Sequence, residues 1–382
     1  MHVFISAGEP SGDLHGANLV RVLRAKHPGI RITGFGGPKM TAAGADLLFD
    51  LTSLAVMWFG AVIARIRTFI GLAKRAEEHF RSDRPDAIVL IDYPGFNFQL
   101  AKRAHAAGIP VYFFVPPQLW GWAGWRVKKV RRWFTAVLTA LPFEEKWYRD
   151  RGVNTHYTGH PYYDELAAQR LDESFLAEQR DTGGPIVAVL PGSRNQEVAR
   201  NFTDMLSAIR CIHAARPDVR FLVASFNRRQ ADAASAMVKG AGLPIEFHVG
   251  RTPEIIELAN CCLSVSGSVS LEMMYRLKPA AILYKVGTVH WLLGRYLLKM
   301  ARYITLVNLL ADREIYPEYP TCRDRSAELA DHVLSWLNDP MERARCVDQL
   351  RLVRNEVGQT GACDRAADYL LVSLSSQQRP AA

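Results

Sequence analysis

Short apolar runs alternate with longer amphipathic stretches along most of this chain. In its first half, runs rich in β-branched or aromatic residues are followed by turn residues and predict strands, at 2–7, 31–35, 87–92, 110–115 and 135–140. Between them, the stretches near 13–27, 60–82 and 95–107 predict helices. Strands that alternate with helices are typical of a parallel sheet covered on both faces.

A polar stretch around 165–185 interrupts this alternation and predicts a boundary between domains. After it the pattern restarts, with strands predicted at 186–190, 220–225, 245–248 and 262–265. Helices are predicted at 194–215, 229–240, 253–259 and 268–277. We therefore expect an α/β chain of two Rossmann-like parallel-sheet lobes, 1–165 and 185–358, that face each other across a cleft. A single large doubly wound sheet is the structural alternative.

The composition is that of a soluble globular protein large enough for two domains, with 382 residues, 49% hydrophobic and 22% charged. Lysine and arginine number 47, against 38 acidic residues, so the net charge is +9. This excess favours an anionic partner, such as nucleic acid, acidic lipid or a phosphorylated substrate, without choosing among them. The 6 cysteines include no C-x-x-C pair, which indicates reduced thiols in a cytosolic enzyme.

Neither the N-terminus nor the longest apolar run predicts export or a membrane span. A strand is predicted almost at the N-terminus, with no basic and apolar leader before it, so secretion is not expected. The apolar run at 54–64 is shorter than the stretch of about 20 residues that a spanning helix needs. Any contact with a membrane is therefore expected to be peripheral.

The first strand runs into a glycine-bearing turn, Gly8-Glu9-Pro10-Ser11-Gly12-Asp13. This turn matches neither the G-x-G-x-x-G fingerprint nor a Walker A loop. The second strand ends at 34–37 without a carboxylate for a ribose hydroxyl, which counts against a nicotinamide or flavin dinucleotide. The carboxylates in the turn favour a polar ligand edge over a bare connection between strand and helix.

A second turn of this kind follows the strand at 186–190, in Pro191-Gly192-Ser193-Arg194. Ser193 and Gln196 match a capping box at the start of the next helix. Arg194 in the first helical turn would oppose the helix dipole, and an anion held between it and the backbone amides would remove that conflict. An arginine that points into water is the alternative, and we favour the anion site.

A third turn, Ser266-Gly267-Ser268, lies between a strand end and a helix start. Its small residues allow backbone amides to approach a pyrophosphate, and Glu272 could accept hydrogen bonds from ribose hydroxyls. Serine-rich turns are common, so this signal is weak alone. Together with Arg194 in the same lobe, it indicates a site for a nucleoside diphosphate.

Asp92 ends the apolar strand at 87–91 and precedes a Tyr-Pro-Gly turn. A carboxylate at the carboxyl end of a buried strand is desolvated, which suits a general base. Capping of the following turn is an equally good interpretation from this segment alone. No D-x-D pair occurs, so no metal or other cofactor is expected, and Arg194 with the helix amides would stabilise a leaving diphosphate.

Half of the 8 tryptophans lie between 116 and 133, among five basic residues. This composition fits a single-strand nucleic-acid platform, an anionic membrane surface, or an aromatic core beside a solvated basic helix. Apolar stretches with regularly placed cations also occur near 57–75 and 290–300. They favour contact with lipid or acyl chains over contact with bases, through Trp58, Phe59, Trp120, Trp122 and Trp291. No nucleic-acid partner is expected.

These residues, in this order, resemble the lipid-A-disaccharide synthase family of inverting GT-B glycosyltransferases nearly from end to end. The resemblance rests on segments spread over both halves: 7–13, 91–97, 117–122, 159–161, 190–194, 266–268, 271–272, 307–309, 317–318 and 364–367. It also implies that the last segment, 360–382, is a helix that packs back on the first lobe. Another GT-B transferase or a UDP-sugar epimerase is the nearest alternative, and a nucleic-acid-binding protein a distant one.

The resemblance implies transfer of 2,3-diacylglucosamine from UDP-2,3-diacylglucosamine to 2,3-diacylglucosamine 1-phosphate (lipid X). The products would be the β-1′,6-linked lipid A disaccharide 1-phosphate and UDP, formed in the cytoplasm at the inner face of the inner membrane. By the same analogy Asp92 is the catalytic base. The donor would contact Ser193, Arg194, Ser266, Gly267, Ser268, Glu272, Asn308 and Glu318. The acceptor-side residues would be Glu9, Ser11, Gly12, Asp13 and Asn97.

Overall fold

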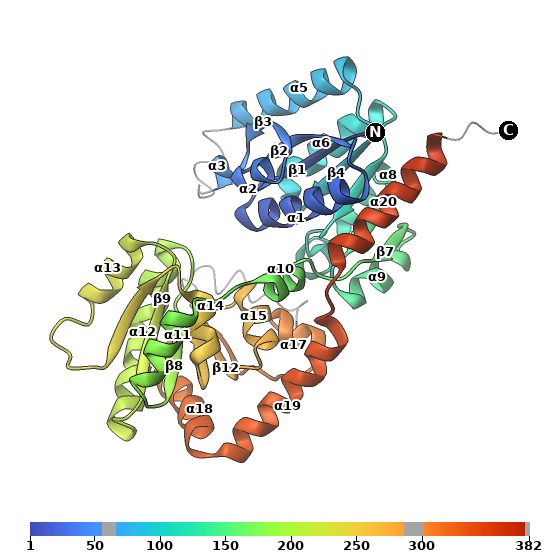
Figure 1. Ribbon diagram of the computed structural model, residues 1–382. Coiled ribbons are helices and arrows are strands. Elements are labelled where there is room, and N and C mark those ends of the chain that lie inside the picture. Colours follow the sequence, from blue (N-terminus) through green and yellow to red (C-terminus); the bar gives the residue numbers. More distant parts are fainter. Residues whose placement is uncertain (56–65, 286–301, 379–382) are drawn as a thin grey trace. The chain divides into compact units, whose positions relative to one another are not determined.

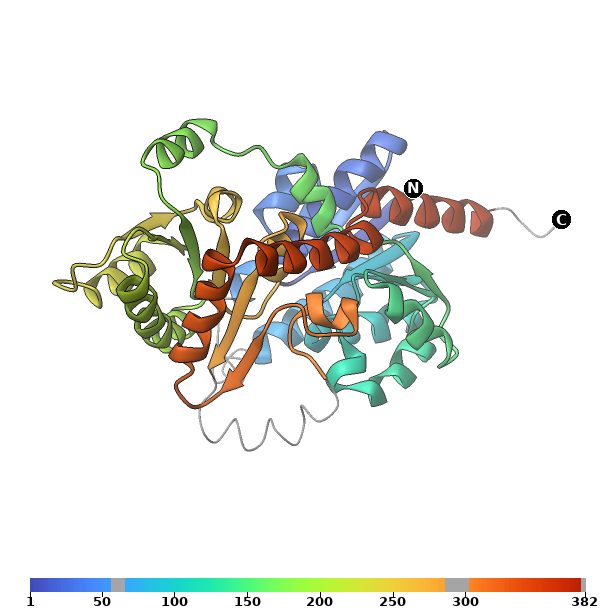
Figure 2. The same ribbon diagram turned by 90° about the horizontal axis from the view of Figure 1, so that it is seen from below.

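The computed structural model describes residues 1–55, 66–285 and 302–378, and its chain divides into two compact units. Unit 1 comprises Met1–Ala167 together with Gln359–Ala382, and unit 2 comprises Ala168–Gly358. Figure 1 follows the chain by colour through both units. Figure 2 traces the C-terminal stretch, in orange and red, as it leaves unit 2 and returns to unit 1.

Unit 1 is built on a parallel sheet of seven strands in the order β3-β2-β1-β4-β5-β6-β7. The strands are β1 His2–Ala7, β2 Arg31–Gly36, β3 Asp46–Asp50, β4 Ala87–Ile91, β5 Val111–Phe114, β6 Ala136–Thr139 and β7 Thr155–Tyr157. β3 and β7 were not predicted. Both lie at sheet edges and are only partly buried, and β3 begins and ends with aspartate, so neither has the continuous apolar run of a central strand.

Helices cover both faces of this sheet. They are α1 Pro10–Lys26, α2 Pro38–Ala42, α3 Thr52–Ala55, α5 Ile66–Ser82, α6 Pro94–Ala106, α7 Leu119–Trp122, α8 Val127–Trp133, α9 Pro142–Arg149, α10 Tyr162–Ala168 and α20 Ala362–Gln378. One apolar cluster joins alternate strand residues such as Phe4 to α5 and α6. The other joins the intervening residues such as Ile5 to α1 and α20. Two buried faces account for the unbroken apolar runs of the central strands.

The returning helix α20 contributes Cys363, Ala366 and Leu370 to the second cluster. At its exposed side, Lys26 Nζ of α1 lies 2.7 Å from Asp368 Oδ1 of α20. Tyr112 on β5 is also bonded to this helix, with its hydroxyl 2.6 Å from that of Ser373. Apolar burial and these polar contacts together hold the C-terminal segment in unit 1.

Unit 2 has a parallel sheet of six strands in the order β10-β9-β8-β11-β12-β13. The strands are β8 Ile186–Leu190, β9 Arg220–Ser225, β10 Ile245–Val249, β11 Cys261–Ser264, β12 Ala280–Lys285 and β13 Glu318–Thr321. The helices are α11 Glu173–Asp181, α12 Asn195–Ala215, α13 Arg228–Ala236, α14 Thr252–Leu258, α15 Val269–Tyr275, α17 Leu306–Ala311, α18 Ser326–Asn338 and α19 Pro340–Val357. The alternative of one large sheet is therefore wrong.

Each sheet reverses its strand order at one place. In unit 1, β2 and β3 extend the sheet on one side of β1, and β5, β6 and β7 extend it on the other side of β4, so the reversal lies between β1 and β4. In unit 2 it lies between β8 and β11. At such a reversal the two neighbouring connections leave on opposite faces, which opens a crevice at the carboxyl ends of the strands. Ligands of open α/β sheets bind in that crevice. Within the described residues, no helix combines the length and apolarity of a bilayer crossing.

Two histidines meet in unit 1, of which His15 is buried and His160 is only partly exposed. His15 on α1 and His160 after β7 have ring centroids 5.5 Å apart, with the rings nearly perpendicular. Burial, with His160 and Lys39 nearby, lowers the pKa of His15 to about 3. Burial likewise lowers the pKa of His160 to about 4. Both imidazoles are therefore neutral in the folded protein at neutral pH.

This pair predicts acid-sensitive folding. An unfolded histidine becomes charged below about pH 6.5, whereas the folded pair stays neutral. The free energy of unfolding therefore has its full value above that pH and falls as the pH drops toward the folded pKa values. Each histidine should cost about 2 kcal/mol of unfolding free energy at pH 5. Urea titrations between pH 7.5 and 5 should show a flatter pH dependence in the His15→Gln, His160→Gln double variant. The exposed His105→Gln variant is the control, and parallel curves for all three proteins would refute the idea.

Candidate active site

In unit 1, the turns that follow β1 and β4 lie side by side at the reversal of the sheet, because β1 and β4 are paired along their length. Glu9 follows β1 and is the N-cap of α1, and Asp92 follows β4 directly before α6. Both carboxylates are only partly exposed. The fold thus brings together two predicted residues, Glu9 and Asp92, that lie far apart in the sequence.

The surroundings of Asp92 favour its protonated form. Burial, and then the charge of Glu9, raises the pKa of Asp92 to about 6, while a hydrogen bond from the Tyr93 backbone opposes the rise. Burial and Glu9 also raise the pKa of Tyr93 above its usual value. A carboxylate with a pKa near 6 is ionised at neutral pH and is a much stronger base than an ordinary aspartate. This is the position at which the sequence predicted a general base.

Two predicted acceptor-side residues, Asp13 and Asn97, form hydrogen bonds within the protein. The buried carboxylate of Asp13 accepts hydrogen bonds from the backbone N–H groups of Gly37 at 2.8 Å, Lys39 at 3.0 Å and Met40 at 3.1 Å, and so caps α2. Asn97 is completely buried and bonded to the β1 and β4 backbones. Gly12 is also buried, whereas Ser11 is exposed. Of the residues predicted at this edge, Glu9, Ser11 and Asp92 therefore have accessible polar side chains.

In unit 2, the turns after β8 and β11 are neighbours in the same way, because these two strands are paired. The first turn carries Ser193 and Arg194, and the second carries Ser266, Gly267 and Ser268. Ser193, Arg194, Gly267 and Ser268 are accessible at this edge. The Ser266 hydroxyl donates to the carbonyl oxygen of Ile304 at 3.0 Å. The predicted diphosphate residues thus lie at the reversal of the second sheet.

The predicted capping box of α12 is displaced by one residue. Arg194, not Ser193, is the N-cap, and Glu197, not Gln196, accepts from the N-cap backbone, with Arg194 N 3.2 Å from Glu197 Oε2. Gly192 lies just before this box with a φ of +121°, and a Cβ there would lie 2.7 Å from Glu197 Cβ, so glycine leaves room for the Glu197 side chain.

Glu197 also offsets part of the charge that the sequence assigned to a bound anion. Its Oε1 lies 3.0 Å from Arg194 Nη1, so an internal carboxylate already faces the arginine at the start of α12. The Arg194 side chain nevertheless remains 71% exposed. A guanidinium has five donor hydrogens in a planar fork, so contact with one carboxylate leaves donors for a second anion.

Glu272 lies in the first turn of α15 and is nearly buried, at 4% exposure. Arg276, one turn later, places its Nε 3.3 Å from Glu272 Oε1 and its Nη1 2.9 Å from Glu257 Oε2. Glu272 is therefore part of an ion-pair chain inside unit 2. A ribose hydroxyl bound by Glu272 would add a further hydrogen bond to this series of ion pairs.

Asn308 and Glu318 form a polar network beneath the Ser266 turn. Glu318 accepts hydrogen bonds from the backbone N–H groups of Ile304 at 2.7 Å and Thr305 at 2.8 Å, and from Asn308 Nδ2 at 2.8 Å. Asn308 Oδ1 accepts from the N–H groups of Ile315 and Tyr316 at 2.8 and 2.9 Å. Both side chains thus fix the backbone of 304–318. Because Ser266 donates to Ile304, the network also supports the Ser266 turn.

The tryptophan segment divides into an anchored and an exposed part. Trp120 Nε1 donates to the buried carboxylate of Glu144 at 3.0 Å, and its ring packs edge-on against Phe143. Burial raises the pKa of Glu144 to about 7. Trp125, for which the sequence predicted no role, is 68% exposed. Trp58, Phe59 and Trp291 lie outside the described residues.

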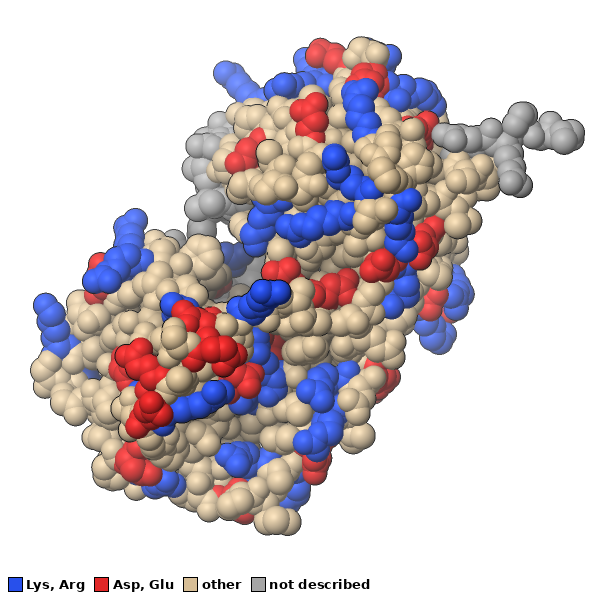
Figure 3. Space-filling model, viewed as in Figure 1, with Lys and Arg blue, Asp and Glu red and all other residues tan. Residues whose placement is uncertain are grey.

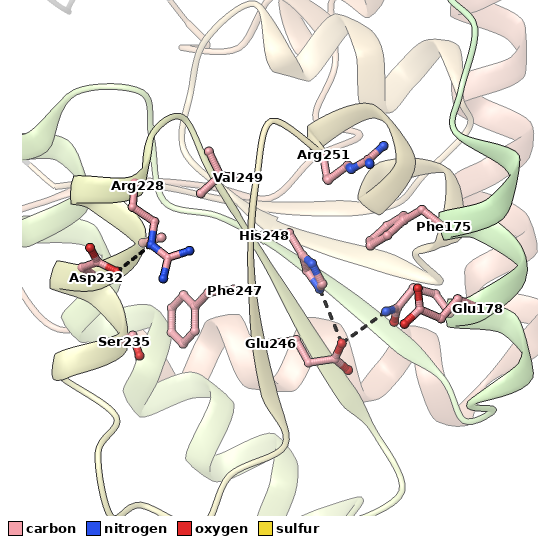
Figure 4. Close-up of a pocket in the computed structure, with 12 residues that line it drawn as sticks. Phe175, Glu178, Arg228, Asp232, Ser235, Glu246, Phe247, His248, Val249 and Arg251 are labelled. Atoms are coloured by element: carbon pink, nitrogen blue, oxygen red, sulfur yellow. Dashed lines mark hydrogen bonds and ion pairs between the residues drawn. The ribbon is translucent and has the colours of Figure 1, made fainter.

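A separate pocket of about 530 Å³ lies along the edge strand β10, between α11 and α13 (Figure 4). It is lined by Phe175, Glu178, Gln179, Arg228, Ala231, Asp232, Ser235, Glu246, Phe247, His248, Val249 and Arg251. Within this lining, Arg228 Nε lies 3.1 Å from Asp232 Oδ1, and His248 Nε2 lies 3.4 Å from Glu246 Oε2. None of the residues predicted from the sequence lines this pocket, and we assign it no role in the site.

Among the described residues, His2, His79 and Asp83 are close enough together to hold a metal ion. However, Arg31 Nη1 already lies 3.0 Å from Asp83 Oδ1 and offsets the charge of that carboxylate. His2 begins β1, so this group lies at the opposite end of the strand from the turn that bears Glu9. The three residues are therefore remote from the edge of the sheet that carries Asp92.

Residues 3–369 match the family described as lipid-A-disaccharide synthetase. The chain belongs to this family. It is 33% identical over 375 residues to the lipid-A-disaccharide synthase of Myxococcus xanthus, covering 97% of each chain. It is 34% identical over 374 residues to that of Syntrophus aciditrophicus, again covering 97% of each. The predictions of family and of glycosyltransferase activity in lipid A biosynthesis are confirmed.

Solved structures show the same fold at low sequence identity. A UDP-bound structure of MnaA from S. aureus has a TM-score of 0.68 at 12% identity and covers 98% of this chain and 97% of its own. CalG4, the calicheamicin glycosyltransferase, has a TM-score of 0.62 at 14% identity and covers 99% of each chain. With the two parallel sheets, these similarities confirm the predicted α/β GT-B fold.

Proposed function

We propose that this glycosyltransferase moves 2,3-diacylglucosamine from UDP-2,3-diacylglucosamine to the 6-hydroxyl of 2,3-diacylglucosamine 1-phosphate. The products are the β-1′,6-linked disaccharide 1-phosphate and UDP. The observation that carries the proposal is the placement of a basic carboxylate at the reversal of one sheet and an exposed arginine at the reversal of the other. The names of the relatives supply the substrate class.

Unit 1 supplies the base in this proposal. The acceptor hydroxyl loses its proton to Asp92 as its oxygen attacks the anomeric carbon of the donor. Attack from the face opposite the departing diphosphate inverts the anomeric centre and gives the β linkage. The raised pKa of Asp92 suits this step, because it brings the carboxylate closer to the pKa at which proton transfer is effective at neutral pH.

Unit 2 supplies the stabilisation of the leaving group. Breaking the bond between sugar and diphosphate leaves negative charge on UDP, which preorganised donors stabilise most effectively. Arg194, the exposed turn at Gly267 and Ser268, and the N-terminal amides of α12 offer such donors. Asn308 and Glu318 act here as supports of the donor site, since their side chains are engaged with residues 304–318.

The direct test is incubation with both purified acylated sugars, with released UDP and the mass of the lipid product as readouts. We expect Asp92→Asn to abolish product formation while UDP binding persists, because the amide cannot accept the proton. In the wild-type enzyme, kcat should fall as the pH drops through about 6, where Asp92 becomes protonated. Donor incubated alone is the control that detects an epimerase. Normal turnover by Asp92→Asn would remove this residue from the mechanism.

Arg194→Ala should weaken UDP binding by about ten- to hundredfold, the scale of a lost charged hydrogen bond. Its matched control is Arg210→Ala, because Arg210 is an exposed arginine near the other end of the same helix, α12. Isothermal titration with UDP measures both variants. Equal affinities for the wild type and Arg194→Ala would contradict the assignment of this guanidinium to the diphosphate.

The proposal places the enzyme in the cytoplasm, on the inner face of the inner membrane, where its lipid substrates lie. Unit 1 supports a peripheral contact: Trp125 is 68% exposed and Ile66 and Ile70 of α5 are 55% and 49% exposed. Cations of α8 follow Trp125 directly, at Lys128, Lys129, Arg131 and Arg132. In the view of Figure 3, lysine and arginine are interspersed with aspartate and glutamate on the visible surface. Aromatic and aliphatic groups beside cations suit an anionic bilayer surface.

Trp125→Ala should therefore lower binding to vesicles that contain anionic lipid by about tenfold, the effect expected from removing a large aromatic anchor. Co-sedimentation with anionic vesicles, compared with neutral ones, measures this. Leu352→Ala is the control, because Leu352 is an apolar residue of unit 2 with a similar exposure, 63%. Equal loss in both variants, or equal binding to both kinds of vesicle, would refute the assignment.

A further inference from the structure

Unusual backbone conformations gather around Asp92. Asp92, Tyr93 and Val115 have φ angles of +43°, +47° and +50°, in the left-handed region that side chains other than glycine rarely adopt. They lie at the carboxyl ends of the adjacent strands β4 and β5, and Asp92 N donates to Val115 O at 3.3 Å. A β-branched valine in this region is a clear outlier. Such conformations persist only where surrounding contacts enforce them.

Asn97, on the first turns of α6, makes the contacts that enforce this turn. Its Nδ2 donates to Asp92 O at 2.7 Å and to Ile91 O at 3.0 Å. One amide thus binds the carbonyl groups of the last residue of β4 and the first residue of the turn. Ser6 of β1 orients that amide, because its hydroxyl donates to Asn97 Oδ1 at 2.8 Å. Ser6 and Asn97 are both completely buried. The side chain of Asn97 therefore has a single hydrogen-bonded orientation.

A second contact fixes the other half of the turn. The ring of Tyr93 lies directly against the Cα of Gly8, where a Cβ would come within 2.2 Å of the ring. Only glycine at position 8 leaves room for the ring in this place. Gly8 and Ser6 both belong to the end of β1 or the turn that follows it. The end of β1 and the turn after it thus hold the Asp92 turn in two ways: Ser6 acts on its backbone through Asn97, and Gly8 contacts the ring of Tyr93.

We propose that Asn97, oriented by Ser6, is a positioning residue that holds Asp92 in its left-handed turn and thereby aims the carboxylate at the acceptor hydroxyl. This inference rests on the proposed role of Asp92 as the base. Without the Asn97 amide, the carbonyls of Ile91 and Asp92 lose their shared donor, and the turn can relax to an extended or helical conformation. The carboxylate would then leave the partly buried place beside Glu9 and Tyr93.

The Ser6→Ala variant tests the proposal with the smallest change. It removes the hydroxyl that orients Asn97 and leaves Asp92, Glu9 and Asn97 chemically unchanged. We expect kcat to fall by about ten- to hundredfold, since a displacement of about 1 Å of a reacting group has effects of that size. UDP affinity should stay unchanged, because the UDP residues belong to unit 2. The acid limb of the kcat profile should also move to lower pH as Asp92 becomes more solvated.

Asn97→Asp is a second variant of nearly the same shape. It keeps an acceptor for Ser6 but replaces the amide donor with an oxygen that faces the two carbonyl oxygens, so the loss of kcat should be at least as large. Ser373→Ala is the matched control. It removes one serine hydroxyl bonded to Tyr112 in the same unit, remote from the β1 and β4 turns, and should leave kcat and the pH profile unchanged.

The outcomes separate this inference from the function on which it rests. If Asp92→Asn is inactive while Ser6→Ala keeps the wild-type kcat and acid limb, the positioning role is wrong and the base remains. If Ser6→Ala loses stability to the same extent as Ser373→Ala but only Ser6→Ala changes kcat and the acid limb, positioning is supported. If Asp92→Asn is fully active, both the base and its positioning are wrong.

Discussion

The structure depends on one constraint of parallel sheets: consecutive strands are joined by crossovers, so a sheet that grows in both directions must reverse its order somewhere. Here the reversals fall between β1 and β4 and between β8 and β11. The connections on either side leave by opposite faces, so the carboxyl ends of these strands stay uncovered. Every polar residue that we assign to chemistry, from Glu9 and Asp92 to Arg194 and the Ser266 turn, follows one of these four strands.

A second consequence is that many polar residues near these edges serve the backbone and not a ligand. Buried polar atoms need hydrogen-bond partners, and a turn packed at a sheet edge exposes several backbone groups that need them too. Asp13 satisfies three N–H groups at α2, and Glu318 satisfies two at Ile304 and Thr305. The sequence resemblance singles out both kinds of residue, those that bond the backbone and those that would contact substrate. Their hydrogen bonds in the structure distinguish the two kinds.

The sequence predicted the alternating architecture because central strands and long helices have strong periodic signals. It missed three edge strands with weak signals: β3 is bounded by aspartates, β7 has three residues, and β13 contains Pro320, whose missing N–H an edge strand tolerates. No element was predicted over 278–358, so the buried strand β12 and the helices α18 and α19 were missed as well. The helix predicted from 194 begins at Asn195. The capping box of α12 uses Arg194 and Glu197, because Glu197 reaches the Arg194 N–H, and residue spacing did not distinguish this pair from Ser193 and Gln196.

The same limit applies to the site. The sequence singled out Asp92 from its place after a buried strand, and that inference needed only the strand. Its basicity depends also on Glu9, which lies far earlier in the chain and becomes a neighbour only through the pairing of β1 with β4. The left-handed turn depends on Ser6 and Asn97, whose contact spans 91 positions in sequence. Local patterns can thus locate a reactive group, whereas its strength and direction come from contacts that only the folded sheet creates.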